Sequence, residues 1–262
     1  MLSDRSRGQG TISKAPSPHS GRMKDVVREN FDASVTAYDG YEEQTRRFTT
    51  LARLLAAEMT THKDGTLETV LDAGAGTGVS TRVFAERAQQ TVALDISREM
   101  LRKVSVAPQA QADFDRLPFV ADAFDGVAFT ASLFLVPDPS VAVREAERVL
   151  RSGGVVGAVA PLGWVDADGT DAFASLDRES RSLTRASKVN TALETAFDVA
   201  TGTWRFATTA EEIRHFHAIP AMAARLYPSL DPDERVVRAR KLLDSLEGTF
   251  EQRWQWVVGV HE

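Results

Sequence analysis

Hydrophobic and polar positions follow two different periods along this chain. From Val26 to Met59 the apolar residues recur at helical spacing, with a break near Asp39-Gly40, which predicts two helices. Between residues 67 and 160, short β-branched runs alternate with amphipathic segments. They predict strands at 68–74, 91–95, 109–113, 126–131 and 155–160, and helices at 80–88, 98–104 and 140–150. Regular alternation of strand and helix predicts a parallel sheet covered on both faces.

The pattern changes after Ala160. It predicts helices at 171–185, 193–200, 209–216 and 233–246, followed by a last strand at 250–260. Thr209 with Glu212 three residues later predicts a capping box at a helix start. The pattern alone therefore predicts a doubly wound α/β fold with helical additions at both ends, whose ligands bind at the carboxyl ends of the strands.

Composition narrows the classes of function. The 262 residues are 43% hydrophobic and carry a formal net charge of -6, which favours a globular protein without general attraction to nucleic acid or anionic lipid. The absence of cysteine excludes disulfides, thiolate metal sites and a cysteine nucleophile. Residues 1–22 are rich in Ser, Gly and Pro and lack an apolar run, so we expect a disordered tail, with Met23 as an alternative natural start.

The candidate chemistry begins at the glycine-rich turn from Asp72 to Gly78. Glycines after a buried strand let a ligand approach bare backbone. Val79 stands where a dinucleotide fingerprint needs Gly or Ala, which opposes an NAD-dependent oxidoreductase, and the Lys of a P-loop is absent. Asp95 follows Gly74 by 21 residues, the place of an acid that binds ribose hydroxyls; capping of the next helix is the alternative role.

Five motifs in order resemble the class I S-adenosylmethionine-dependent methyltransferases, and more narrowly the biotin-pathway malonyl-carrier O-methyltransferases and quinone C-methyltransferases. They are Val70–Gly78, Ala93–Leu101, Asp113–Phe119, Phe124-Asp125 and Leu150–Gly154. The resemblance covers residues 26–160. It implies a Rossmann-like sheet of seven strands in one domain, 23–262, with an N-terminal helical cover (23–60), a cofactor-binding core (67–160) and a substrate-side region of helices and last strand (161–262).

The resemblance also implies the residues that bind S-adenosylmethionine. The turn residues surround its methionine part, Asp95 binds the ribose, Ile96 and Phe114 lie beside the adenine, Asp113 accepts from the adenine amine, and Tyr38 closes over the cofactor or simply packs. Ser132 and Leu133 border the reacting methyl group. The full expected set is Tyr38, Asp72, Gly74, Gly76, Thr77, Gly78, Asp95, Ile96, Met100, Asp113, Phe114 and Ser132.

Methyl transfer from a sulfonium is an in-line displacement, so the protein mainly aligns the acceptor and a general base is optional. His215 and His217 alternate in sequence, and a structural role is favoured for both, so no catalytic residue is assigned. The acids Asp166, Asp168 and Asp171 surround a glycine and are typical of a solvated turn, so no metal is expected.

We expect an apolar acceptor pocket lined from 134–136, 204–206 and 216–226, or else ordinary core packing there. The predicted activity is methylation of an O or C atom of a small molecule by a cytoplasmic enzyme without nucleic-acid or membrane partners. A carrier-linked carboxyl O-methyltransferase, with Arg46, Arg47 and Arg53 near the pocket mouth, is one alternative. A noncatalytic cofactor-binding or scaffolding protein is another, and the oligomeric state is left open.

Overall fold

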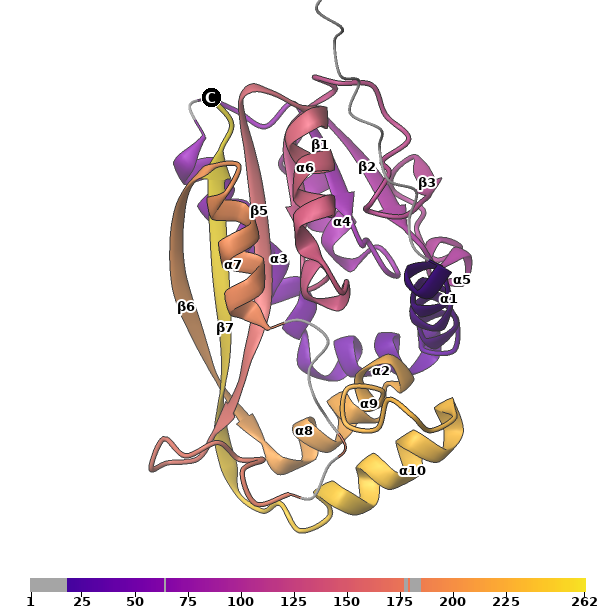
Figure 1. Cartoon of the computed structure of the whole chain (residues 1–262). Helices are drawn as coiled ribbons and strands as arrows, with labels where there is room; N and C mark the ends of the chain where they lie inside the picture. Colours follow the sequence, from indigo (N-terminus) through magenta and orange to yellow (C-terminus); the bar gives the residue numbers. More distant parts are fainter. Residues whose placement is uncertain (1–17, 64, 177–178, 180–184) are drawn as a thin grey trace, which may run out of the picture.

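The computed structural model describes residues 18–63, 65–176, 179 and 185–262. These residues form one seven-stranded sheet in the order β3-β2-β1-β4-β5-β7-β6 (Figure 1). The strands are β1 (Thr69–Ala73), β2 (Gln90–Asp95), β3 (Gln109–Gln111), β4 (Phe124–Phe129), β5 (Leu150–Val165), β6 (Asp198–Thr209) and β7 (Thr249–Val260). The predicted fold class, a Rossmann-like α/β sheet of seven strands, is confirmed.

The strands from β1 to β5 pair in parallel, whereas β7 runs antiparallel to both β5 and β6. The strand order reverses at β1, which lies between β2 and β4. Crossovers from β1 and β4 therefore leave toward opposite sides of the sheet and open a crevice at their carboxyl ends. This is where a ligand site is expected.

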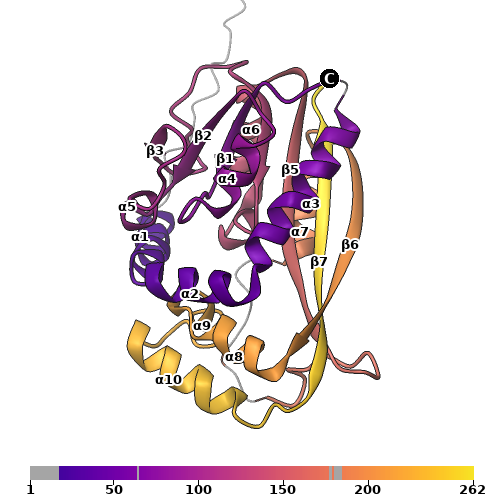
Figure 2. The same cartoon turned by 180° about the vertical axis from the view of Figure 1, so that it is seen from behind.

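Helices cover both faces of the sheet (Figures 1 and 2). On one face lie α3 (Arg47–His62) and α4 (Val79–Ala85), and on the other lie α6 (Pro139–Val149) and α7 (Ala186–Glu194). No helix of the described residues is both long and apolar enough to span a bilayer.

A second group of helices gathers at the carboxyl ends of the parallel strands. Contacts join α1 to α5 and α9, α2 to α8, and α10 to α8 and α9 (Figure 2). Their bounds are α1 (Pro18–Asp32), α2 (Val35–Thr45), α5 (Arg98–Leu101), α8 (Ala210–His217), α9 (Pro220–Ala223) and α10 (Pro232–Leu243). The N-terminal and C-terminal parts of the chain thus form one cover over the crevice.

The core is built where α3 crosses the long central strands. Leu51, Leu55 and Met59 recur at helical spacing and are completely buried. Gly157 of β5 lies directly under them: a Cβ there would lie 2.7 Å from the Met59 sulfur and 2.9 Å from Leu55. The glycine lets helix and sheet approach closely and fixes the position of α3, which begins at the pocket described below.

Several predicted boundaries are wrong at the N-terminus. Three helices replace the expected two, with breaks at residues 33–34 and 46, while Asp39-Gly40 lies inside α2. Arg46 has a left-handed φ of 53° and separates α2 from α3. The first helix begins at Pro18, so residues 18–22, expected in the tail, are helical; residues 1–17 lie outside the described residues.

The region after β5 differs most from the prediction. The helix expected at 193–200 lies earlier, at 186–194, and residues 198–209 form the edge strand β6. Residues 171–176 form a bridge and turns rather than the start of a helix, and most of 177–185 lies outside the described residues. The capping box is confirmed: Thr209 Oγ1 accepts from Glu212 N, and Glu212 accepts from Thr209 N.

Candidate cofactor and acceptor site

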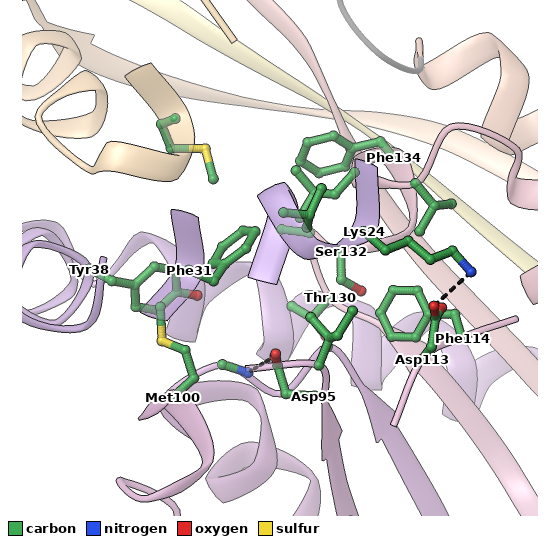
Figure 3. A pocket seen from close by; sticks show the side chains of 18 of the residues that line it. Lys24, Phe31, Tyr38, Asp95, Met100, Asp113, Phe114, Thr130, Ser132 and Phe134 are labelled. Carbon is green, nitrogen blue, oxygen red and sulfur yellow. Dashed lines mark hydrogen bonds and ion pairs between the residues drawn. The ribbon is translucent and has the colours of Figure 1, made fainter. Parts of the chain in front are cut away.

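A pocket lies at the carboxyl ends of the parallel strands, under the helical cover (Figure 3). It is lined from β1 through Gly74 and Gly76, from β2 through Asp95, and from β4 through Thr130 and Ser132. The helices α1, α2 and α3 also contribute lining residues. Phe216, Met222 and Trp254 come from the C-terminal third of the chain. The pocket is therefore at the predicted place, the crevice beside β1.

The glycine-rich turn is held by hydrogen bonds within the protein. The amides of Gly74 and Ala75 both donate to Leu94 O, at 2.7 and 2.9 Å, and Gly78 N donates to Ala75 O. Gly74 has φ +83°, and a Cβ there would lie only 2.3 Å from Ser132 Cβ. The turn therefore offers close approach to its backbone, while its amides at Gly74, Ala75, Gly76 and Gly78 already donate within the protein.

The loop after β4 meets this turn. Ser132 Oγ donates to Ala73 O at 2.7 Å, which ties the ends of β4 and β1 together. Ala131 has φ +57°, a left-handed conformation that costs a non-glycine residue about 1–2 kcal/mol. Thr130, Ala131 and Ser132 all line the pocket, and Thr130 Oγ1 is buried without a hydrogen-bond partner among the described residues. Such strain is typical of functional sites.

Asp95 braces the turn from the end of β2. Its Oδ2 accepts from Gly76 N at 2.9 Å and its Oδ1 accepts from Ser97 N at 2.8 Å (Figure 3). Ser97, not Asp95, is the N-cap of α5, because its hydroxyl accepts from Met100 N. Burial raises the pKa of Asp95 to about 6. Each carboxylate oxygen keeps one lone pair for a ligand hydroxyl.

Asp113 follows β3 and is paired with the cover. Lys24 Nζ of α1 lies 2.7 Å from Asp113 Oδ2 and also pairs with Asp115 (Figure 3). Phe114 packs edge-on against Phe129 of β4, with ring centroids 5.4 Å apart. Lys24 thus connects α1 to the far edge of the pocket.

Asp72 at the end of β1 does not line the pocket. Its Oδ2 accepts from the hydroxyls of Ser80 and Thr81, at 2.8 and 2.7 Å, while Oδ1 has no partner among the described residues. Its side chain is completely buried, and this burial raises its pKa to about 6. Asp72 therefore joins β1 to the start of α4. Its charge can act electrostatically on a ligand in the pocket without direct contact.

Tyr38 of α2 lies over the turn. Its ring stacks on Phe48 with centroids 4.4 Å apart and lies 3.9 Å from the Cβ position of Gly76. Burial raises the pKa of the Tyr38 hydroxyl well above 10, so the group is neutral at physiological pH. From the sequence, Tyr38 was expected either to contact the cofactor or only to pack. In the structure it packs against Phe48 and also lines the pocket, where a ligand could contact it.

The other end of the pocket is apolar. It is lined by Phe48, Phe134, Leu135, Val136, Phe216, Met222 and Trp254. Charged lining residues among the described part of the chain are Lys24, Asp95 and Asp113, all toward β2 and β3. We call the side with the three charged residues the polar half of the pocket and the side lined by these seven apolar residues its apolar half.

Comparison with known proteins relates this chain to a protein family. Residues 71–158 match the family model described as methyltransferase domain. The chain therefore carries a methyltransferase domain over these residues. A demethylmenaquinone methyltransferase of Corynebacterium urealyticum is 36% identical over 134 residues, which are 50% of this chain and 55% of that one. A malonyl-[acyl-carrier protein] O-methyltransferase of Hamiltonella defensa is 35% identical over 91 residues, 33% of this chain and 35% of that one.

The chain thus spans about half the length, or less, of these relatives. Among solved structures, the YcgJ protein of Bacillus subtilis superposes with a TM-score of 0.55 at 18% identity, covering 79% of this chain and 97% of that one. The [4+2]-cyclase SpnF superposes with a TM-score of 0.51 at 21% identity, over 80% of both chains. These likenesses show the fold alone, which by itself does not determine a reaction.

The structure brings most of the expected cofactor residues of the methyltransferase domain together. Nine of the twelve line the pocket: Tyr38, Gly74, Gly76, Asp95, Ile96, Met100, Asp113, Phe114 and Ser132. The others, Asp72, Thr77 and Gly78, belong to the turn but do not line the pocket, and Leu133 is buried without lining it. Because Gly78 is the N-cap of α4, this helix begins away from the pocket.

Neither histidine that the sequence raised lines the pocket. His217 is buried, with Nδ1 2.9 Å from Ile213 O, and it packs against Trp164 and Phe173. His215 is exposed and pairs with Gln44. The acids near Gly169 form a turn in which Asp166 Oδ1 accepts from Asp168 N and Thr170 N.

Other pocket residues were missed from the sequence. Lys24, Val27 and Phe31 line the pocket from α1, at the i, i+3, i+7 spacing of one helix face, which is the signal that could have found them. Trp254 lines it from β7, whereas Trp204 and Phe206 do not. No local signal marks Trp254, because its place depends on how β7 inserts between β5 and β6.

Proposed function

We propose that this chain is a methyltransferase that uses S-adenosylmethionine to methylate an O or C atom of an apolar small molecule. The observation that carries the proposal is the division of one pocket into a polar half at β2 and β3 and an apolar, aromatic half at the C-terminal side. Such a pocket holds a polar nucleoside and an apolar partner end to end.

S-adenosylmethionine is the methyl donor of class I methyltransferase domains, and the residues of the polar half suit it. The free lone pairs of Asp95 suit ribose hydroxyls, and Asp113 offers a carboxylate to an adenine amine. Ile96 and Phe114 offer apolar surfaces to a flat base. When bound, the cofactor supplies a methyl group on a sulfonium, whose departure as a thioether requires no proton from the protein.

The chain's own contribution is alignment. The loop 130–132, fixed to β1 through Ser132, and Tyr38 on the opposite side border the middle of the pocket. Placing an acceptor there converts a bimolecular encounter into an oriented one. Since the apolar half has no Asp, Glu or His among its described lining residues, the acceptor must bring its own nucleophile, an ionised oxygen or an electron-rich carbon.

This environment supports an aromatic or quinone-like acceptor over a carrier-linked carboxylate. Flat apolar rings suit Phe134, Phe216 and Trp254. The three arginines considered for a carrier do not form one surface patch, because Arg46 and Arg53 are exposed whereas Arg47 is buried and donates to Ala207 O at 3.3 Å. We therefore place the carrier-linked reaction second.

The experiment is transfer of labelled methyl from S-adenosylmethionine to a panel of phenols, hydroquinones and fatty acids. We expect turnover with an aromatic member, and a loss of at least tenfold in cofactor affinity in Asp95→Asn, because the amide cannot accept from both backbone amides and a ribose. Asp233→Asn, at an exposed position on α10, is the matched control.

Tight cofactor binding without turnover on any acceptor would favour the alternative of a noncatalytic binding protein. Full affinity in Asp95→Asn would remove this residue from the proposed ribose contact.

A further inference from the structure

Strand β7 carries polar side-chain atoms that the fold leaves without partners. Gln252 is 1% exposed and Trp254 is completely buried. Neither amide atom of Gln252, nor the indole Nε1 of Trp254, has a hydrogen-bond partner among the described residues. Most buried polar groups are satisfied, so three orphaned atoms on adjacent positions of one strand face require an explanation.

These two side chains lie on the face of the sheet that α3 covers. In the register of β6 and β7, Gln252 lies opposite Phe206 and Trp254 lies opposite Trp204. Arg47, the first residue of α3, stacks over the Phe206 ring at 4.2 Å. Figure 2 shows α3 running across β5 and β7 on this side. The orphaned atoms are therefore enclosed between β7 and the start of α3.

Of these two residues, Trp254 lines the apolar half of the pocket, and Gln252 lies two positions earlier on the same strand face without lining it. Trp254 lines the pocket together with Phe48, which follows Arg47 in α3, and Phe216. Asp113 comes from the end of β3, at the opposite side of the sheet order. Five strand spacings separate β3 from β7, which at about 4.8 Å each is about 24 Å. The cofactor residues lie between β3 and β4, so Trp254 belongs to the acceptor end.

A buried guanidinium, that of Arg47, lies over Phe206, the cross-strand neighbour of Gln252. The Arg47 side chain is buried, its Nη2 donates to Ala207 O, and its Nε has no partner. Among the described residues this guanidinium has no ion pair within 4.0 Å, but it interacts with the Tyr41 hydroxyl, on which Glu212 also acts. A guanidinium beside unpaired N–H donors favours an atom of negative charge or partial charge.

We propose that Trp254 and Gln252 form a hydrogen-bonding subsite at the inner end of the acceptor pocket, for a carbonyl or ionised hydroxyl oxygen on an apolar ring. The indole N–H and the amide NH₂ donate to this oxygen, and Arg47 supports it electrostatically. The subsite would orient the ring so that its far side reaches the methyl position near Ser132. This inference rests on the proposed function, which it makes more specific.

The test compares 2-methyl-1,4-naphthoquinone, which carries two carbonyl oxygens, with 2-methylnaphthalene, which carries none. Both are titrated calorimetrically into the full chain saturated with S-adenosylhomocysteine. The chain has no cysteine, so the quinone finds no thiol to react with. The measured quantity is the ratio of the two dissociation constants. We expect Trp254→Phe and Gln252→Leu each to reduce the preference for the quinone about fivefold, the equivalent of one hydrogen bond.

Trp204→Phe is the matched control, because Trp204 lies opposite Trp254 but neither lines the pocket nor carries a buried nitrogen without a partner. Its ratio should remain within about twofold of wild type. Thermal unfolding separates recognition from packing. Gln252→Leu should unfold at no lower temperature than wild type, since replacing an unsatisfied buried amide by an apolar side chain of similar size is neutral or stabilising.

An unchanged ratio in both β7 variants would overturn the subsite and indicate that the orphaned atoms face water. Failure of both probes to bind the loaded wild type would also overturn it. Failure of S-adenosylhomocysteine itself to bind would instead contradict the proposed function, so the two failures are distinguishable.

Discussion

The substitution Asp72→Asn should stabilise the protein while weakening its binding of the methyl donor. Asp72 is completely buried and its pKa is raised from 3.8 to about 6 by burial, against the opposing effect of the Thr81 and Ser80 hydroxyls. The folded protein therefore binds this proton more tightly than the unfolded chain does. The stabilising contribution is fully present below about pH 4 and is lost as the pH rises to about 6.

The magnitude follows from the pKa difference. Each unit of difference between the folded and the unfolded pKa corresponds to about 1.4 kcal/mol. At neutral pH, the ionised carboxylate therefore lowers the stability of the folded protein by about 3 kcal/mol. Asparagine removes this charge and can still accept from both hydroxyls, but it places an amide N–H where Oδ1 had no partner, at a cost of about 1–2 kcal/mol. The net gain is about 1–2 kcal/mol, or a rise in Tm of about 2–8 °C.

The assay is thermal unfolding at pH 7.5 and pH 5 for the wild type, Asp72→Asn and the exposed control Asp198→Asn. We expect the gain over wild type at pH 7.5 to shrink at pH 5, where the wild-type carboxyl is largely protonated. Titration with S-adenosylmethionine at pH 7.5 should show weaker binding, because a buried negative charge behind the turn is lost. A variant less stable than wild type at pH 7.5, or a gain that does not depend on pH, would refute this reasoning.

Three further substitutions test the packing around the pocket. Gly74→Ala should lower stability by at least about 2 kcal/mol in urea unfolding, because φ is +83° and the new Cβ would collide with Ser132; wild-type stability would contradict the close approach. Leu55→Ala in α3 should cost about 2–5 kcal/mol in the same measurement, and a loss below 1 kcal/mol would mean that the helix does not form the core. Lys24→Met should cost less than about 1 kcal/mol, since its pair with Asp113 is partly exposed, and its effect should fall further in high salt.

The central half of the fold could be predicted because its signals are local. Strands β1 and β2 are short, largely apolar runs that end next to Gly74 and at Asp95, β4 is a buried run of six residues, and the longer helices between the strands carry one apolar face. The turn at Asp72–Gly78 and the acid at Asp95 mark the carboxyl ends of adjacent strands, so their convergence follows from the topology. Most expected cofactor residues therefore line one pocket.

The remaining parts depend on long-range contacts that a local pattern does not encode. Residues 198–209 pair with β7 over their whole length, and this pairing overrides the helical spacing read near 193–200. Asp72 has the sequence signature of a ligand residue but turns toward Ser80 and Thr81. Trp254 enters the pocket from the last strand, at the opposite end of the chain from Lys24, so only the tertiary fold reveals it.

The most direct test of the account is calorimetric titration of the purified chain with S-adenosylmethionine, S-adenosylhomocysteine and NAD, each separately. We expect micromolar binding of both adenosyl compounds and none of NAD, because Asp95 and Asp113 suit an adenosine while Val79 stands in place of the third glycine of a dinucleotide turn. Binding of NAD alone, or of none of the three, would contradict the assignment of this pocket to a methyl donor.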